Sequence, residues 1–251
     1  MHNPSFFQRA VAGATALILA LSLAAPAAAD DDDDDDGDDR RTYQVTIAIV
    51  GGFEDNGQPL TPPLIVATEH RHDLFKVGRR ASFELQQIAE NGNLGPALTE
   101  FGDAVGADAP LVPAGSPGDA SFDQSVTLTI VADEDERFLS WASMLICTND
   151  GFTGLNSLRL PRRVGGSVTA FTAGYDAGTE VNTEDFADMV PPCQGLIGVS
   201  SGEPGTGMTN PALAEGGRIR HHPGISGGAD LDPDVHGWTD PVAMVVVTRV
   251  G

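Results

Sequence analysis

The chain has 251 residues, with 36 aspartates and glutamates against 14 lysines and arginines, and a formal net charge of −22 at pH 7. So negative a surface repels phosphate backbones and anionic headgroups, which argues against nucleic-acid binding and membrane-surface binding. Divalent cations and positively charged partners are the classes that this charge favours.

Residues 1–29 have the layout of a secretory signal peptide. Arg9 precedes an apolar run over residues 10–25, and Pro26 and three alanines follow. The helix-breaking Pro26 and the Ala-x-Ala ending favour cleavage after Ala29 over a membrane anchor. We therefore expect an exported protein, periplasmic or extracellular, that is not inserted in the membrane after cleavage.

Residues 30–41 form an acidic segment that contains nine aspartates and no apolar residue. Mutual repulsion and the lack of any side chain to bury are typical of a disordered tail. An EF-hand loop starting at Asp32 would need a bidentate glutamate at its twelfth position, which is Tyr43. The tail is predicted to attract divalent cations only weakly, and a polyanionic, cation-buffering protein stays an alternative function.

Residues 42–251 are predicted to form one β-sandwich domain. Patterns rich in β-branched residues, with Gly, Pro, Asn and Asp between them, predict strands at residues 42–50, 64–68, 125–132, 137–148, 157–160, 167–175 and 241–250. From Ser121 onward the turns come at intervals too short for βαβ crossovers, which favours an all-β, antiparallel sandwich.

Short helical insertions are predicted between the strands. Residues 82–91 have apolar side chains at helical spacing, a serine at the start and Gly92 after the end. A second short helix is predicted over residues 96–105. The segment 191–240 has little periodicity, and its length predicts either a structured functional loop or elements that the pattern does not reveal.

The chain contains two cysteines, Cys147 and Cys193. In an oxidising compartment such a pair favours a disulfide over two free thiols, and the spacing matches neither a CxxC redox motif nor a zinc motif.

Two predicted strands end in acidic turns. The strand at residues 137–148 runs into Asp150, and the strand at residues 167–175 runs into YDAGTE, which supplies Asp176 and Glu180. Exposed turn aspartates are common, so the alternative interpretation of each turn alone is a solvated loop.

The three carboxylates would meet if the strands that contain Leu145 and Phe171 lie side by side. Carboxylates that converge without histidine or cysteine select a hard cation, and calcium tolerates the variable coordination that loops provide. The sequence therefore predicts a site for one Ca²⁺ ion at Asp150, Asp176 and Glu180.

The residues around these turns resemble the spondin N-terminal domain. The resemblance is carried by TND-GF-GLNSLRLP and YDAGTE, with TPPLIVATEH, LFKVG and HGWTDPVAMVVVTR elsewhere between Tyr43 and about Val250. It implies a C2-like β-sandwich with calcium in the loops at one end. The function that it implies is an interaction or adhesion module without catalytic activity, whose partner is an extracellular or envelope protein or glycan.

The resemblance matches Asp150, Asp176 and Glu180 to the acidic positions of the family. Glu180 stands where the family has aspartate, and its extra methylene changes how a carboxylate reaches an ion. Thr148 and Asn149 stand where the family has Ser-Pro, so this turn lacks the rigid proline.

Two other chemistries are weaker in the sequence. Ser226 lies in a G-x-S-x-G match, but both flanks look like loops, where a nucleophile elbow needs a strand before and a helix after. An envelope serine hydrolase using Ser226 is kept as an alternative function. His221, His222 and His236 with Asp230 or Asp232 could bind zinc, but no HExxH motif supports this and a polar surface loop is the simpler interpretation.

Overall fold

The computed structural model describes residues 40–51, 57–71 and 73–251. The chain divides into two units, residues 1–37 and residues 38–251, and every described residue belongs to the second unit. The signal peptide and most of the acidic segment lie outside the described residues, so the predictions made for them stay predictions.

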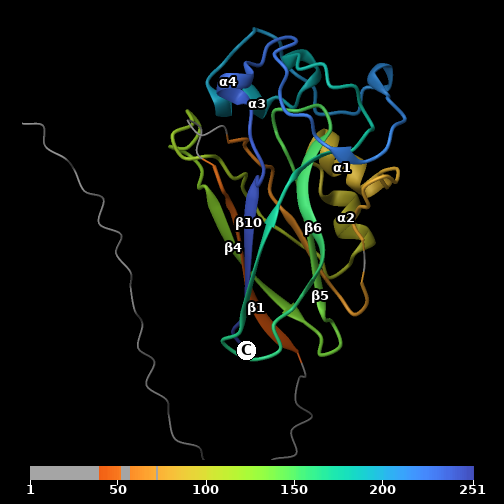
Figure 1. Ribbon diagram of the computed structural model, residues 1–251, viewed down its shortest axis with the longest axis vertical. Helices are drawn as coiled ribbons and strands as arrows, with labels where there is room; N and C mark the ends of the chain where they lie inside the picture. Colours follow the sequence, from red (N-terminus) through yellow and green to blue (C-terminus); the bar gives the residue numbers. More distant parts are fainter. Residues whose placement is uncertain (1–39, 52–56, 72) are drawn as a thin grey trace, which may run out of the picture. The chain divides into compact units, whose positions relative to one another are not determined.

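Within the described residues, ten strands form two antiparallel sheets (Figure 1). The four-stranded sheet has the order β4 (Ser125–Ala132), β1 (Arg41–Ile49), β10 (Ala243–Arg249) and β7 (Ser167–Thr172). The six-stranded sheet has the order β3 (Val105–Gly106), β2 (Leu64–Thr68), β5 (Phe138–Met144), β6 (Gly151–Arg159), β8 (Gly174–Asp176) and β9 (Arg220–His221). The predicted all-β antiparallel sandwich is confirmed.

The main core lies between the two sheets. Along β1 and β10 every second side chain is buried, as the two-residue period of a strand requires. These side chains, such as Ile47 and Val245, belong to one cluster with Leu139 and Trp141 of β5. Trp141 is therefore a core residue.

Two helices pack beside the six-stranded sheet (Figure 1), and they explain why β5 is buried on both faces. Helix α1 (Phe83–Asn91) is capped by the Ser82 side chain, which accepts a hydrogen bond from Leu85 N at 3.2 Å, and it ends at Gly92 in the left-handed region. The first predicted helix is confirmed. Helix α2 (Gly95–Glu100) is shorter than predicted because residues 105 and 106 pair with β2.

The predicted strand at residues 167–175 is wrong as a single element. It divides into β7, in the four-stranded sheet, and β8, in the six-stranded sheet, so the chain crosses between the sheets at Ala173. Phe171 pairs with Met244 of β10, whereas Leu145 lies just after β5 in the other sheet. The strands of Leu145 and Phe171 are consequently not neighbours, and another pairing must bring the acidic turns together.

The segment after β8 is structured. It contains the 3-10 helices η1 (Phe186–Asp188) and η2 (Pro211–Leu213), α3 (Pro192–Ile197), α4 (Pro233–His236) and β9. Figure 1 shows α3 and α4 among the loops at the upper end of the sandwich. The predicted disulfide between Cys147 and Cys193 is confirmed, and it joins α3 to the segment between β5 and β6 within a buried apolar cluster. Within the described part of the chain, no helix has the length and apolar character needed to cross a bilayer.

Candidate metal centre

The pairing of β6 with β8 brings two acidic turns together. In this register Gly151 lies opposite Asp176, so Asp150 precedes one strand where Asp176 ends the other. Ala177 N donates to the Asp150 carbonyl at 3.1 Å, and both aspartate side chains are fully buried. The predicted meeting of Asp150 and Asp176 therefore occurs, through β6 and β8.

The Asp150 carboxylate is held by the turn that follows β8. Its Oδ2 accepts hydrogen bonds from Thr179 N at 2.6 Å, Thr179 Oγ1 at 3.1 Å and Glu180 N at 3.0 Å. Its Oδ1 is buried and accepts none. Burial, and then the negative charge of Asp176, raise the pKa of Asp150 to about 6.

The Asp176 carboxylate is bound on both oxygens. Oδ1 accepts from Gly178 N at 2.8 Å, and Oδ2 accepts from Asn182 Nδ2 at 2.7 Å and pairs with the Arg220 guanidinium at 2.9 Å. Arg220 is about half exposed and also pairs with Glu215. The side-chain oxygen of Asn182 is buried without a partner. Asp150 Oδ1 and the side-chain oxygen of Asn182 are thus two buried oxygens near Asp176 that accept no hydrogen bond.

Glu180 contributes its backbone to this site, while its side chain is held elsewhere. Its Oε1 accepts a hydrogen bond from Asn210 N at 2.7 Å. Burial, followed by the carboxylates of Glu90, Asp150 and Asp188, raises the pKa of Glu180 to about 7. Burying a charged carboxylate is therefore unfavourable at Glu180 as well as at the two aspartates.

The donors present fit a hard cation only in part. Among the described residues, no group of three or more His, Cys, Asp or Glu side chains is arranged to hold a metal ion. The unpartnered oxygens are nevertheless of types that bind calcium: a carboxylate oxygen from Asp150 and an amide oxygen from Asn182. Sequence reasoning missed Asn182, although its amide lies only two residues after Glu180 in the same turn.

Ser226 lies in an irregular loop with neither the strand before it nor the helix after it that a nucleophile elbow needs. Ser226 N, Gly227 N and Gly228 N donate to the Glu184 carboxylate at 2.5, 2.8 and 2.8 Å. These hydrogen bonds lower the pKa of Glu184 against the opposing effect of burial. The amides that could otherwise bind an oxyanion are occupied by this side chain.

The three histidines have separate environments. His221 is exposed and lies 3.9 Å from an oxygen of Asp240. His222 packs on Trp238 with ring centres 4.9 Å apart, and burial lowers its pKa to about 4. His236, the last residue of α4, accepts a hydrogen bond at Nδ1 from the backbone N–H of Asp232, which precedes the helix. Trp238 packs against the main core, so this part of the loop anchors to the sandwich.

Comparison with known proteins finds no family model that matches the chain and no curated protein that matches its sequence. The likeness to the spondin N-terminal domain therefore rests on the residues quoted above and stays a prediction.

Proposed function

We propose that this protein is an exported, calcium-binding β-sandwich of the spondin N-terminal type that acts as an interaction module and not as an enzyme. The observation that carries the proposal is the buried Asp150 carboxylate, whose Oδ1 has no partner, beside the second buried carboxylate of Asp176. The disulfide between Cys147 and Cys193 supports an oxidising compartment outside the cytoplasm.

Asp150, Asp176 and Asn182 would hold the ion. An all-oxygen donor set in irregular loops suits calcium, which accepts variable coordination, better than magnesium, which requires a near-ideal octahedron. When bound, calcium would neutralise the two aspartates and order the turn between residues 177 and 182. Glu180 is left out of this ligand set, because its Oε1 accepts the hydrogen bond from Asn210 N.

The loops around the site also expose apolar side chains. Val181 follows Glu180 directly and is 48% exposed, and Met208, two residues before Asn210, is 76% exposed. Apolar and methionine side chains beside ordered loops are features of protein interaction surfaces. A partner that binds this end of the sandwich would thus contact loops that are ordered only when the ion is bound.

Calcium titration by calorimetry tests the proposal. We expect one ion per chain, and a rise in melting temperature that corresponds to about 1.4 kcal/mol when calcium is in tenfold excess over its dissociation constant. Asp176→Asn should abolish both effects. Unchanged stability of the wild type in calcium and in EDTA would overturn the proposal. Many weak sites that disappear when residues 30–39 are deleted would instead support the polyanion alternative.

Arg220 provides a second test that does not require loss of function. Its guanidinium occupies an oxygen of Asp176 that calcium would use, so Arg220→Ala should tighten calcium binding. Arg218→Ala is the matched control, because Arg218 is exposed, lies in the same segment and donates to the Gly78 carbonyl. Equal effects of the two substitutions would show that only the overall charge matters.

A further inference from the structure

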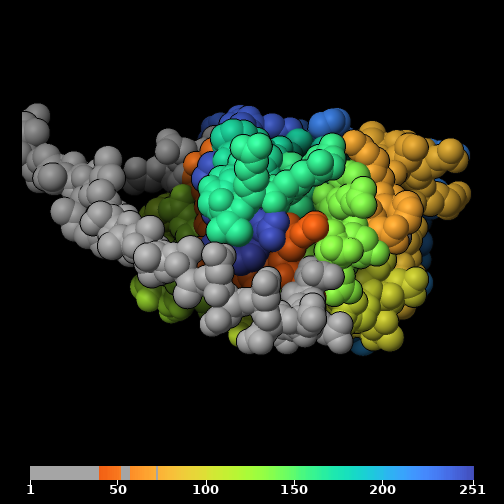
Figure 2. Space-filling model, turned by 90° about the horizontal axis from the view of Figure 1, so that it is seen from below, coloured from red at the N-terminus to blue at the C-terminus, as the bar shows by residue number. Residues whose placement is uncertain are grey.

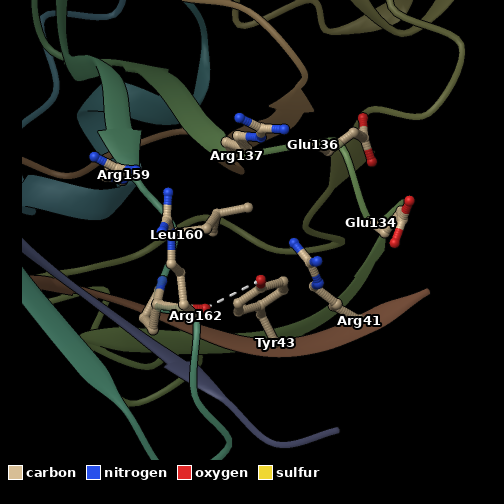
Figure 3. Close-up of a pocket in the computed structure, with 9 residues that line it drawn as sticks. Arg41, Tyr43, Glu134, Glu136, Arg137, Arg159, Leu160 and Arg162 are labelled. Atoms are coloured by element: carbon tan, nitrogen blue, oxygen red, sulfur yellow. Dashed lines mark hydrogen bonds between the residues drawn. The ribbon is translucent and has the colours of Figure 1, made fainter. Parts of the chain in front are cut away.

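A second site lies at the opposite end of the sandwich. It is a pocket of about 310 Å³ between the start of β1, the turn that joins β4 to β5, and the segment that begins at the end of β6. Four arginines line it: Arg41, Arg137, Arg159 and Arg162 (Figure 3). Four of the 14 basic residues of a chain with net charge −22 are thus collected around one cavity.

The topology separates this pocket from the metal centre. Asp150 directly precedes β6, whereas Arg159 is the last residue of that nine-residue strand. A strand of this length spans about 26 Å at ~3.3 Å per residue. Figure 2 looks at the pocket's end of the molecule, where the red start of β1 lies between the teal segment after β6 and green residues of the β4 to β5 region. The pocket and the candidate metal centre therefore lie near opposite ends of β6.

The pocket is lined by more positive than negative side chains, four arginines against two glutamates. Within the described residues, none of the four guanidinium groups makes an ion pair or a side-chain hydrogen bond. Glu134 and Glu136 line one side of the pocket, away from Arg159 and Arg162 (Figure 3). Burial raises the pKa of Glu136, and the carboxylates of Asp133, Asp103 and Asp135 add to this effect against a hydrogen bond from Asp133 N. Positive charge is thus left available to an external anion.

The floor of the pocket is apolar and fixed. Tyr43 is buried in the main core, and its hydroxyl donates to the Pro161 carbonyl at 3.2 Å. Leu160 is buried beside it in the same cluster. A cavity with guanidinium groups above an aromatic and aliphatic floor suits a ligand that combines an oxyanion with a small ring or apolar body.

We propose that this pocket binds a small organic phosphate or sulfate ester, with Arg41, Arg137, Arg159 and Arg162 as its charged partners and Tyr43 and Leu160 as its floor. The planar guanidinium matches the forked oxygens of both groups. A small ligand is favoured over a polyanion chain because the negative charge of the remaining surface repels a long polymer outside the pocket.

Titration calorimetry with phenyl phosphate and phenyl sulfate, at low salt and in EDTA, tests this proposal. We expect one site per chain, with weaker binding as salt is added. Phenyl phosphate should bind more tightly than phenyl sulfate if the doubly charged group is the better fit, and the reverse order would assign a sulfate ester. Because EDTA removes calcium, binding in this buffer is independent of the proposed metal site. No binding of either probe by the wild type overturns the proposal.

Variants then locate the site. Arg162→Ala should weaken phenyl phosphate binding by about tenfold, because a charge-assisted contact is lost. Arg163→Ala removes the same charge from the next residue, which does not line the pocket, and should change the affinity by less than about twofold. Equal losses in both variants would show non-specific attraction and overturn the assignment.

Glu134→Gln should increase the affinity for phenyl phosphate, a change that loss of folding would not produce. Glu134 is exposed and its carboxylate opposes an anion at the rim. Neutralising it should strengthen phenyl phosphate binding several-fold, whereas a destabilised variant would bind less. Unchanged affinity would contradict the placement of the ligand between Arg41 and the turn after β4.

Discussion

Gly151 of β6 lies directly opposite Asp176 of β8, and this pairing sets the Asp150 carboxylate beside a second buried carboxylate. Because β8 begins only after the chain has crossed between the sheets, both aspartates belong to one sheet. Burying this charge pair destabilises the calcium-free fold, since only the Asp176 carboxylate forms an ion pair, with the half-exposed Arg220.

The first prediction concerns the pH dependence of calcium-free stability. The pKa of Asp150 is about 6 in the folded protein, whereas an unfolded aspartate has a pKa of about 3.9. Between these values the folded state binds more protons, so this group makes the free energy of unfolding fall as the pH rises. Glu180, with its pKa raised to about 7, acts in the same direction.

Asp150→Asn stays neutral and isolates this contribution. In EDTA we expect the variant to exceed the wild type by about 2 to 3 kcal/mol at pH 7.5 and to match it near pH 4. His222, whose pKa is lowered to about 4, has the opposite pH dependence but is common to both proteins. Urea unfolding across this range measures the difference, and a constant difference would contradict the assignment. Calcium should stabilise only the wild type.

The second prediction compares two glycines with positive φ. Gly178 has φ 69°, and a Cβ there would lie 2.5 Å from Arg218 N, whereas Gly165 has φ 78° and nothing within 4 Å. Gly165→Ala should cost about 1 kcal/mol from backbone strain alone. Gly178→Ala should cost about 3 kcal/mol or more, because the backbone of residue 218 must also move.

The Gly178 substitution should also weaken calcium binding, since Gly178 N positions Asp176 Oδ1 at 2.8 Å. Chemical denaturation and calcium titration of the two alanine variants provide the measurement. Similar stabilities of the two variants would mean that the close approach to Arg218 imposes no constraint.

The third prediction concerns the disulfide. Cys147 and Cys193 are 46 residues apart, and closing such a loop stabilises a fold by about 4 kcal/mol in the chain-entropy account. The double variant Cys147→Ser with Cys193→Ser should lose a stability of this order, and a reducing agent should affect only the wild type. Equal melting temperatures of oxidised and reduced wild type would refute this expectation.

The fourth prediction concerns Glu184, whose carboxylate holds the loop of Ser226 through three backbone amides. Glu184→Gln should reduce the free energy of unfolding by about 2 to 4 kcal/mol, because hydrogen bonds to a charged acceptor are lost or weakened. Ser226→Ala keeps the three amides and should cost less than about 1 kcal/mol. Limited proteolysis within residues 222–230 should increase in the first variant; equal resistance of both variants would contradict the role of the carboxylate.

Local chemistry was sufficient to predict most of the individual elements. The β-branched runs at β1 and β4, and the serine and glycine at the ends of α1, carry their structure in their own residues, because strand period and helix capping are short-range effects. The disulfide was predictable because the chain has only two cysteines.

The two aspartates of the candidate site were predictable from the sequence, but the strand pairing that brings them together was not. Acidic turns after predicted strands indicate Asp150 and Asp176, but the predicted pairing of the strands that contain Leu145 and Phe171 is wrong, since β6 and β8 bring the aspartates together. The alternation of residues 167–175 fails at Phe171, and Gly174 follows Ala173, but neither residue by itself indicates that the chain changes sheets there. The roles of Asn182 and Arg220 were also missed, because each depends on a residue distant along the chain or across the turn.

The sequence by itself determined the all-β class, the capped helix, the cysteine pair and the two aspartates of the candidate site, since these follow from local patterns and from composition. Only the tertiary structure decided which sheet each strand joins, which carboxylate oxygens lack a donor, and that four dispersed arginines surround one cavity. The reason is that strand partners, and therefore burial and charge neighbours, are selected by packing across the whole sandwich.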